Sequence, residues 1–338
     1  WSRERSRDIR DTFTAIIAKA KELRVDCLFI AGDLFHRQPL ARDLKEVNYL
    51  FSTIPGTRVV IIAGNHDRIR KSSALLSFTW APNVTFLMDE DLSSVYFEEL
   101  NTEVYGFSYH TAEITEAKID NISLPASRRT RILMLHGGDA KHVPFDRNAL
   151  AASPFSYIAL GHIHKPEVLL ENRMAYAGSP EPLDMTETGP HGYFVGEIDT
   201  ASGHVTSLQF KEVCQAQYIP LVVNVTPQTT NTELSQIIAD EIRKRGAGNI
   251  YRFRIRGMRD PDISFDLDLL SGQWNIIEIL DESEPQYDFH ALFAEHPSDM
   301  IGFYIQALMK EDMSPVEKKA LYYGIHALLM TKDERSQP

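Results

Sequence analysis

The sequence predicts an α/β fold in which two packed β-sheets lie between outer layers of helices. Two observations support this prediction. Amphipathic helical segments alternate with nearly continuous apolar runs in the first part of the chain, and such runs are typical of strands buried on both faces. Extended segments then dominate from residue 84 to residue 213, which indicates a second sheet and a layered α-β-β-α sandwich.

The first two helix–strand pairs establish the pattern. In the first helix, apolar side chains recur at helical spacing, and in each strand the apolar run ends abruptly at a glycine followed by a polar residue. The helices are predicted at 7–24 and 41–52, and the strands at 26–31 and 58–63. Helices that alternate with buried strands favour a layered α/β sheet.

Strands are more frequent than helices in the middle of the chain. Only two short helices are expected there, near 111–119 and at 145–152. The strands are predicted at 84–88, 96–109, 131–136, 157–161, 173–177, 192–198 and 204–213. This arrangement predicts one large domain over residues 1–214.

A boundary near 214–218 separates this domain from the rest of the chain. Residues 217–286 contain a strand–helix–strand pattern of their own and are expected to form a small α/β domain, whereas residues 287–338 are predicted to be helical. The last helix should begin at the capping-box sequence Ser314-Pro315-Val316-Glu317. Two terminal helices can close a core or dock a partner, and the helical spacing of Tyr322, Tyr323, Ile325, Leu328 and Leu329 favours a core.

Composition restricts the class of protein. The 338 residues contain two cysteines, far apart and outside any CxxC pattern, so neither a disulfide framework nor a structural zinc site is expected and a reducing cytoplasm is the expected location. There is no signal-peptide pattern and no apolar run near the ~20 residues that span a bilayer, so no membrane association is expected.

The formal net charge of −12 argues against a surface that binds nucleic acid everywhere. It does not exclude a local basic groove, because only the charge that faces a nucleic-acid backbone matters. Basic clusters occur at 68–71, 128–131 and 243–245. The plainer interpretation of each cluster is solvated surface.

Four predicted strands share one feature, a sudden change from apolar residues to Gly, Asp, Asn or His at the carboxyl end. These segments are FIAGD (29–33), IIAGNHD (61–67), LMLHGG (133–138) and YIALGHIH (157–164). Because the carboxyl ends of parallel strands meet at one edge of a sheet, we expect these polar side chains to converge. A single strand-end histidine is more often structural, but four such segments in this order form a specific pattern.

The residue types at these strand ends are carboxylate, amide and imidazole. This set suits Mn, Fe or Zn better than Ca or Mg alone. A carboxylate such as Asp33 can bridge two ions ~3.5–4 Å apart, and such a pair can bind both oxygens of an in-line displacement. His66 projects differently from its neighbour Asn65 and suits a group that hydrogen-bonds a scissile phosphate or protonates the leaving oxygen.

These segments resemble the motif series of the calcineurin-like metallophosphoesterases, which runs DxH, GD, GNH(D/E), H and GHxH. Within that superfamily, residues 176–180 and Gly192-Tyr193 are similar to SbcD-type DNA repair exonucleases, including the YhaO-like bacterial branch. The resemblance covers nearly the whole chain, although the small domain and the terminal helices match by layout and not by motif. It implies a Mn-dependent exonuclease and endonuclease that acts on DNA, works with an SMC-like ATPase of SbcC type and forms a homodimer.

The resemblance also implies a role for each motif residue. Asp33 would bridge the two divalent ions, and His164 would bind the first ion. Asn65, His136 and His162 would bind the second ion, and His66 would be the phosphate-directed catalytic histidine. Residues 217–286 would cap the DNA, and residues 287–338 would dock the ATPase.

Two departures from the family pattern stand out. Family members often have GDLFD, whereas this chain has His36 at the last position; His36 can be a surface residue, a hydrogen-bond partner of a ligand or a DNA contact. No Asp-x-His occurs before residue 33, and the chain begins at Trp1. Since the DxH motif lies on a strand before the first helix, we expect the native protein to carry that strand upstream of this chain.

Two other residues are candidate substrate contacts. Arg68 follows the GNHD segment, and His110 ends a predicted strand, although a loop histidine without a role is the plainer interpretation of His110. His191 is expected to be a turn residue.

Two further function classes remain open. One is a phosphoesterase of small phosphate esters or phosphoproteins, because the same ions bind monoesters and diesters. The other is a non-catalytic subunit that serves as a scaffold for an ATPase. The small domain and terminal helices favour the nuclease over the first alternative. The five ligand-type residues argue against the second for the native protein, whereas it stays open for this chain without the DxH motif.

Overall fold

A computed structural model describes residues 2–120 and 122–335, so Trp1 lies outside the described residues. The chain divides into two compact units. The first comprises residues 1–219 with 248–250, and the second comprises residues 220–247 with 251–338. All the predicted site residues lie in the first unit.

The first unit contains two larger β-sheets. One is a parallel sheet in the order β1-β2-β3, formed by β1 (Cys27–Ala31), β2 (Arg58–Ile62) and β3 (Val84–Leu87). The other is a six-stranded sheet in the order β4-β5-β6-β7-β9-β8, parallel from β5 to β9 and antiparallel at both edges. Its strands are β4 (Ser93–Phe97), β5 (Thr102–Gly106), β6 (Thr130–His136), β7 (Tyr157–Gly161), β8 (Glu167–Leu170) and β9 (Met174–Tyr176).

Apolar side chains of β2 alternate between two cores. Val59 and Ile61 pack in a cluster with residues of α1 (Ser2–Leu23) and α2 (Ala41–Ser52). Val60 and Ile62 pack in a cluster with residues of β5, β6 and β7. Because side chains of a strand point alternately to opposite faces, the parallel sheet lies between the helices and the second sheet.

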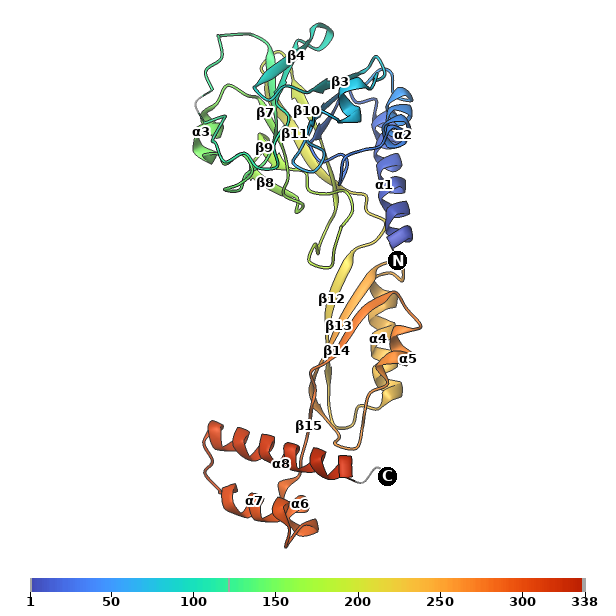
Figure 1. Ribbon diagram of the computed structural model, residues 1–338, viewed down its shortest axis with the longest axis vertical. Coiled ribbons are helices and arrows are strands. Elements are labelled where there is room, and N and C mark those ends of the chain that lie inside the picture. The colour runs from blue at the N-terminus through green and yellow to red at the C-terminus, as the bar shows by residue number, and fades with distance from the viewer. Residues whose placement is uncertain (1, 121, 336–338) are drawn as a thin grey trace. The chain divides into compact units, whose positions relative to one another are not determined.

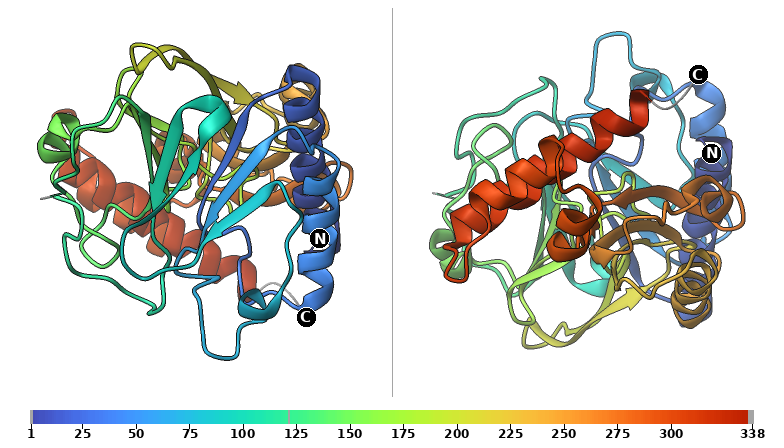
Figure 2. Two further views of the ribbon diagram at one scale, coloured as in Figure 1. Left: turned by 90° about the horizontal axis from the view of Figure 1, so that it is seen from above. Right: turned by 90° about the horizontal axis from the view of Figure 1, so that it is seen from below.

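Strand β6 shows the same alternation. Ile132 and Met134 belong to the core between the sheets, whereas Leu133 and Leu135 pack in the outer core that includes Leu150 of α3 (Arg147–Ala152). Helices α1 and α2 therefore lie on one side of the two sheets and α3 on the other (Figure 1), and Figure 2 shows this order from above. The α-β-β-α sandwich predicted from the sequence is confirmed.

A third sheet completes the first unit. It consists of the antiparallel strands β10 (Gly192–Asp199) and β11 (His204–Glu212). The segment between β9 and β10, residues 177–191, has neither helix nor strand and returns to the carboxyl end of β7. Through this contact the segment reaches His164, one of the predicted metal ligands.

The second unit contains a small sheet with two helices, followed by three more helices. The sheet contains β12 (Tyr218–Val225), β13 (Ile250–Arg259), β14 (Ile276–Asp281) and the short β15 (Glu284–Pro285). The helices are α4 (Asn231–Arg245), α5 (Leu267–Ser271), α6 (Phe289–Glu295), α7 (Met300–Leu308) and α8 (Pro315–Arg335).

The C-terminal helices enclose a core of their own. Ile301 and Ile305 of α7 pack against Leu321 and Ile325 of α8. The predicted capping box is confirmed, since the Ser314 backbone N–H donates to Glu317 Oε2 at 2.9 Å and the Glu317 N–H donates to Ser314 Oγ at 3.3 Å. The aromatic part of the predicted core cluster is only partly enclosed, because Tyr323 is 53% exposed.

Two sequence predictions are wrong in detail. The single strand expected over 96–109 is two strands, β4 and β5, because a 3-10 turn at Glu98–Leu100 and a left-handed Asn101 (φ 46°) reverse the chain. The helix expected near 111–119 is absent from that described segment. Ile114 instead makes backbone hydrogen bonds with Lys141 and Val143. Its N–H and C=O groups are therefore paired with a distant segment and not with the neighbouring turns of a helix.

Cys27 and Cys214 are both free thiols. Within residues 2–120 and 122–335, none of the helices combines the length and apolar content that crossing a bilayer requires.

Candidate metal centre

The polar strand ends converge from both sheets. Asp33 follows β1, Asn65 follows β2, and His136 is the last residue of β6, where it is paired with Gly161 at the end of β7. Since parallel strands run in one direction, their carboxyl ends lie at the same edge of each sheet. The packing of the two sheets brings both edges together around His136.

His136 is the centre of this arrangement. Its Nδ1 lies 2.8 Å from the carbonyl oxygen of Ala31. Its Nε2 lies 2.9 Å from Asn65 Oδ1 and 3.2 Å from Asp33 Oδ2. Because a carbonyl only accepts, the hydrogen of a neutral ring is on Nδ1, and the lone pair of Nε2 then faces two oxygens.

Three electron-pair donors that face one another repel unless a positive charge lies among them. A proton on Nε2 or a cation can supply that charge, and His136 is only 2% exposed. One carboxylate, one amide oxygen and one imidazole are ligands that Mn, Fe and Zn accept. The arrangement of Asp33, Asn65 and His136 therefore fits a divalent ion.

Asp33 is held in its ionised form. Burial alone would raise the pKa of this carboxyl group, but the hydrogen bond and positive charge that His136 supplies when it is protonated lower it, and so does the backbone N–H of His66, which donates to Asp33 Oδ1 at 2.9 Å. The net pKa lies below the ordinary value of an aspartate. An ionised carboxylate is the form that binds a metal.

Two of the predicted ligands have left-handed backbone conformations. Asp33 has a φ of 51° and His162 has a φ of 91°. Such values are uncommon for residues other than glycine and cluster at functional sites, where the surrounding structure maintains them. The strain supports a binding role for these two positions.

Gly64 permits the close approach of the two loops. A Cβ at this position would lie 2.2 Å from Asp33 Oδ1 and 2.7 Å from His136 Cε1. We therefore expect Gly64→Ala to displace both side chains and to weaken Mn²⁺ binding by roughly 10–100-fold, as for the loss of a group that orients a ligand. Isothermal titration of the chain with Mn²⁺ measures the affinity.

Gly56→Ala is the matched control, because a Cβ at Gly56 would meet nothing within 4 Å. It should bind Mn²⁺ as the unmodified chain does. An unchanged affinity in Gly64→Ala would mean that the ion is not bound between Asp33 and His136.

The two histidines of the GHIH segment are each held by a carboxylate. His162 Nε2 lies 2.8 Å from Asp139 Oδ2, and His164 Nδ1 lies 2.5 Å from Glu187 Oε1. Each contact occupies one ring nitrogen and leaves the opposite nitrogen, Nδ1 of His162 and Nε2 of His164, as the candidate ligand atom. Burial lowers the pKa of His162, which favours the neutral ring that binds metal, whereas the hydrogen bond to Glu187 raises the pKa of His164.

Asp139 also contacts His142, and the sequence pattern indicated no role for either residue. His142 Nδ1 lies 2.9 Å from Asp139 Oδ2. Burial would raise the pKa of Asp139, but hydrogen bonds from His142 and His162 lower it below its ordinary value. Asp139, His142 and His162 place one ligand atom each within 4.8 Å of one another, so this group could itself hold a cation.

His66 and His36 lie together on the surface. Both are exposed, their rings are stacked with centroids 4.8 Å apart, and His66 Nδ1 lies 3.1 Å from the carbonyl oxygen of His36. Since that carbonyl only accepts, the neutral His66 ring carries its hydrogen on Nδ1, and Nε2 is the atom left for a ligand. The structure thus joins the residue that departs from the family pattern to the predicted catalytic histidine.

The other two candidate substrate contacts bind backbone carbonyls. Arg68 Nη1 donates to the carbonyl oxygen of Asn65 at 2.9 Å, and His110 Nε2 lies 2.8 Å from the carbonyl oxygen of Met88. Both side chains are half-buried. Each contact stabilises a loop, and a role in substrate binding remains a prediction.

Asp67 is a further residue for which sequence analysis gave no role. It is buried, and its carboxylate accepts hydrogen bonds from the N–H groups of Gly64 at 2.8 Å and Phe35 at 3.2 Å. Burial, and to a lesser degree the charge of Asp33, raise the pKa of Asp67 to about 6. Asp67 therefore ties the loop that carries Asp33 to the loop that carries Asn65.

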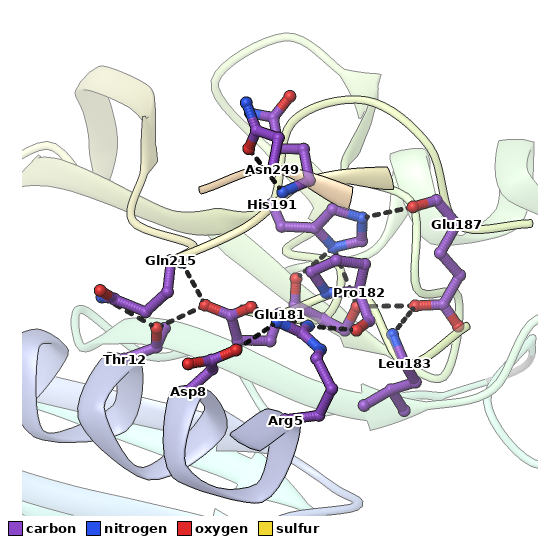
Figure 3. A network of polar contacts seen from close by, with 12 residues as sticks. Arg5, Asp8, Thr12, Glu181, Pro182, Leu183, Glu187, His191, Gln215 and Asn249 are labelled. Carbon is purple, nitrogen blue, oxygen red and sulfur yellow. Dashed lines mark hydrogen bonds and ion pairs between the residues drawn. The ribbon is translucent and has the colours of Figure 1, made fainter. Parts of the chain in front are cut away.

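The prediction that His191 is a simple turn residue is wrong. His191 is 2% exposed, with Nδ1 2.9 Å from the carbonyl oxygen of Ser179 and Nε2 3.3 Å from that of Glu187 (Figure 3). The segment between these residues folds back on itself, and His191 bridges its two ends. Sequence position beside Gly192 gave no sign of this burial.

Comparison with known proteins agrees with this geometry. Residues 4–166 match the family model described as calcineurin-like phosphoesterase. The chain is 29% identical over 270 residues to the uncharacterized metallophosphoesterase YhaO of Bacillus subtilis, an alignment that covers 73% of this chain and 64% of YhaO. It is 30% identical over 196 residues to the DNA double-strand break repair protein Mre11 of Methanocaldococcus jannaschii, covering 54% of this chain and 53% of that protein. The chain thus spans between about half and two thirds of the length of these relatives.

Proposed function

We propose that the chain is a metal-dependent phosphodiesterase that cleaves DNA, since residues 4–166 match the family model described as calcineurin-like phosphoesterase. The observation that carries this proposal is the convergence of Asp33 and Asn65 on the buried His136, with the electron pairs of the three side chains facing one another. A second support is the likeness to proteins named as DNA double-strand break repair proteins.

Two divalent ions are the proposed cofactors; the ligand set accepts Mn, Fe or Zn, and the resemblance to SbcD-type nucleases favours Mn. Asp33 would bridge them, Asn65, His136 and His162 would hold the second ion, and His164 would hold the first. When bound, the ions supply Lewis acidity and lower the pKa of an attacking water. The protein keeps Asp33 ionised and His162 neutral, which are the states that ligands need.

His66 is the proposed catalytic histidine. Its backbone N–H donates to Asp33, its Nδ1 is engaged by His36, and its exposed ring leaves Nε2 for the substrate. From this position Nε2 can hydrogen-bond the scissile phosphate or give a proton to the leaving oxygen. His36, Arg68 and His110 are proposed as further contacts of the DNA.

The rest of the chain is proposed to serve the same reaction. Residues 1–214 would be the nuclease domain, residues 217–286 would cap the DNA, and residues 287–338 would dock an SMC-like ATPase of SbcC type. The last proposal is supported by exposed apolar side chains on α7 and α8, such as Phe303 at 56% and Met330 at 57% exposure, since exposed apolar residues are often binding sites. A homodimer and a cytoplasmic location are proposed with it.

The experiment compares two substrates in the presence of Mn²⁺. We expect the chain to degrade an end-labelled DNA duplex and to hydrolyse an aryl phosphate monoester poorly, with no cleavage in chelator. Monoester hydrolysis with intact DNA would instead support a phosphoesterase of small esters or phosphoproteins. Elemental analysis that finds no bound metal, together with no hydrolysis of either substrate, would support a non-catalytic scaffold.

A further inference from the structure

We propose that Glu187 is a positioning residue that fixes the tautomer and orientation of His164, so that Nε2 of His164 is presented as a metal ligand. This inference deepens the proposed function and rests on it, because His164 binds a metal only if the chain is a metallophosphoesterase. Glu187 lies 23 residues after His164 in the segment that joins β9 to β10.

Both oxygens of Glu187 are engaged, and each meets a different donor. Oε1 lies 2.5 Å from His164 Nδ1, and Oε2 accepts a hydrogen bond from the backbone N–H of Leu183 at 2.8 Å. An ionised carboxylate accepts and cannot donate, so the hydrogen of a neutral His164 ring must be on Nδ1. The unprotonated nitrogen is then Nε2, on the opposite side of the ring.

The backbone of His164 is held by the same segment. Ser179 N–H donates to the carbonyl oxygen of His164 at 2.9 Å. Gly178, with a φ of 76°, allows this approach, since a Cβ there would lie 2.7 Å from the same oxygen. His164 is therefore fixed through its main chain by the start of the segment and through its ring by Glu187.

The segment itself is anchored at a buried residue, Glu181, which is 2% exposed. Glu181 Oε1 accepts from Thr12 Oγ1 at 2.6 Å and from Gln215 N–H at 2.5 Å, and Oε2 accepts from Arg5 at 3.0 Å (Figure 3). Arg5 also donates to the carbonyl oxygen of Pro182 at 2.7 Å. These contacts tie the segment to α1, and His191 bridges its two ends.

A flexible surface loop needs no such anchors, because its polar groups can bind water. A carboxylate that must hold an imidazole in one orientation does need them, since a loose support loses ligand geometry. The side chain of Glu187 is only 15% exposed, which limits competition from water for His164. The anchored segment thus holds the Glu187 side chain in contact with His164.

The substitution Glu187→Gln distinguishes a role of Glu187 in positioning His164 from a role in packing alone. The glutamine side chain has one acceptor and one donor group at its end. The backbone N–H of Leu183 cannot change its role, so we expect the glutamine oxygen to face Leu183 and the NH₂ group to donate to His164 Nδ1. The hydrogen of His164 would then move to Nε2, the nitrogen that should face the ion.

The test is ¹⁵N NMR of the metal-free chain with labelled histidine. Because the hydrogen bond to Glu187 raises the pKa of His164, the spectra are recorded at about pH 9, well above the ordinary imidazole pKa of ~6.5. The His164 signals are assigned by their loss in His164→Ala. We expect a single Nδ1–H tautomer in the unmodified chain, the Nε2–H tautomer in Glu187→Gln, and a mixture in Glu187→Ala. Glu197→Gln, an exposed glutamate on β10, is the matched control and should leave the tautomer unchanged.

An Nε2–H tautomer or a mixture in the unmodified chain would overturn the proposal, and this outcome does not depend on how the variants fold. An unchanged Nδ1–H tautomer in Glu187→Gln would overturn it as well. Mn²⁺ added to the unmodified chain should broaden the ring signals of His164. The expected tautomer without such broadening would leave the positioning contact in place and would count against the proposed function alone.

Discussion

His136→Ala is expected to lower the affinity of the chain for Mn²⁺ by on the order of 10³-fold, because the loss of a ligand should exceed the ~10–100-fold effect of losing a group that only orients a ligand. His136 contributes the one nitrogen that faces both Asp33 and Asn65 in the described contacts. Its loss leaves two oxygens without a nitrogen partner and opens a buried space. Cleavage of DNA with Mn²⁺ should fall in parallel with the affinity.

Isothermal titration with Mn²⁺ measures this effect directly. His204→Ala is the control, because His204 is exposed on β11 and its removal should leave the affinity unchanged. Circular dichroism establishes that the fold is retained. Equal affinities of the His136→Ala and His204→Ala chains would show that the ion is bound elsewhere, for instance by Asp139, His142 and His162.

Asp67→Ala is expected to cause a large loss of stability. The substitution leaves two N–H groups, those of Gly64 and Phe35, without their buried acceptor. Each donor left without a partner costs about 1–3 kcal/mol, so the free energy of unfolding should fall by about 2–6 kcal/mol. Urea unfolding followed by tryptophan fluorescence measures the difference.

Asp67→Asn should be less destabilising, because the amide retains one acceptor oxygen for one of the two N–H groups. Asp91→Ala is the matched control, since the Asp91 side chain is 99% exposed and such changes typically alter stability by less than about 0.5 kcal/mol. An Asp67→Ala chain as stable as Asp91→Ala would contradict the bracing role given to Asp67.

The sequence allows the layers of the sandwich to be predicted because side-chain periodicity reports burial. Helix α2 has the predicted bounds of residues 41–52, and β2 differs from its predicted bounds by one residue. The convergence of Asp33, Asn65 and His136 follows from the same reasoning, since parallel strands end at one edge. Local pattern and topology are sufficient for these features.

The supporting contacts could not be predicted because they join residues far apart in a segment without periodicity. Glu181 binds Arg5 across 176 residues, and Glu187 binds His164 from an irregular stretch. The helix expected near 111–119 failed for a related reason, since backbone pairing of Ile114 with the 141–143 segment outweighed local helical tendency. Tertiary partners decide the conformation of such segments.

The identity of the ligands is tested most directly by electron–nuclear double resonance of Mn²⁺ bound to the chain with ¹⁵N-labelled histidine. We expect nitrogen couplings from His136 and His162 at the second ion and from His164 at the first, with the His136 coupling lost in His136→Ala and none lost in His204→Ala. Such a result would place the ion between Asp33, Asn65 and these histidines. A spectrum without histidine coupling, or one unchanged in His136→Ala, would contradict the metal centre on which the proposed phosphodiesterase depends.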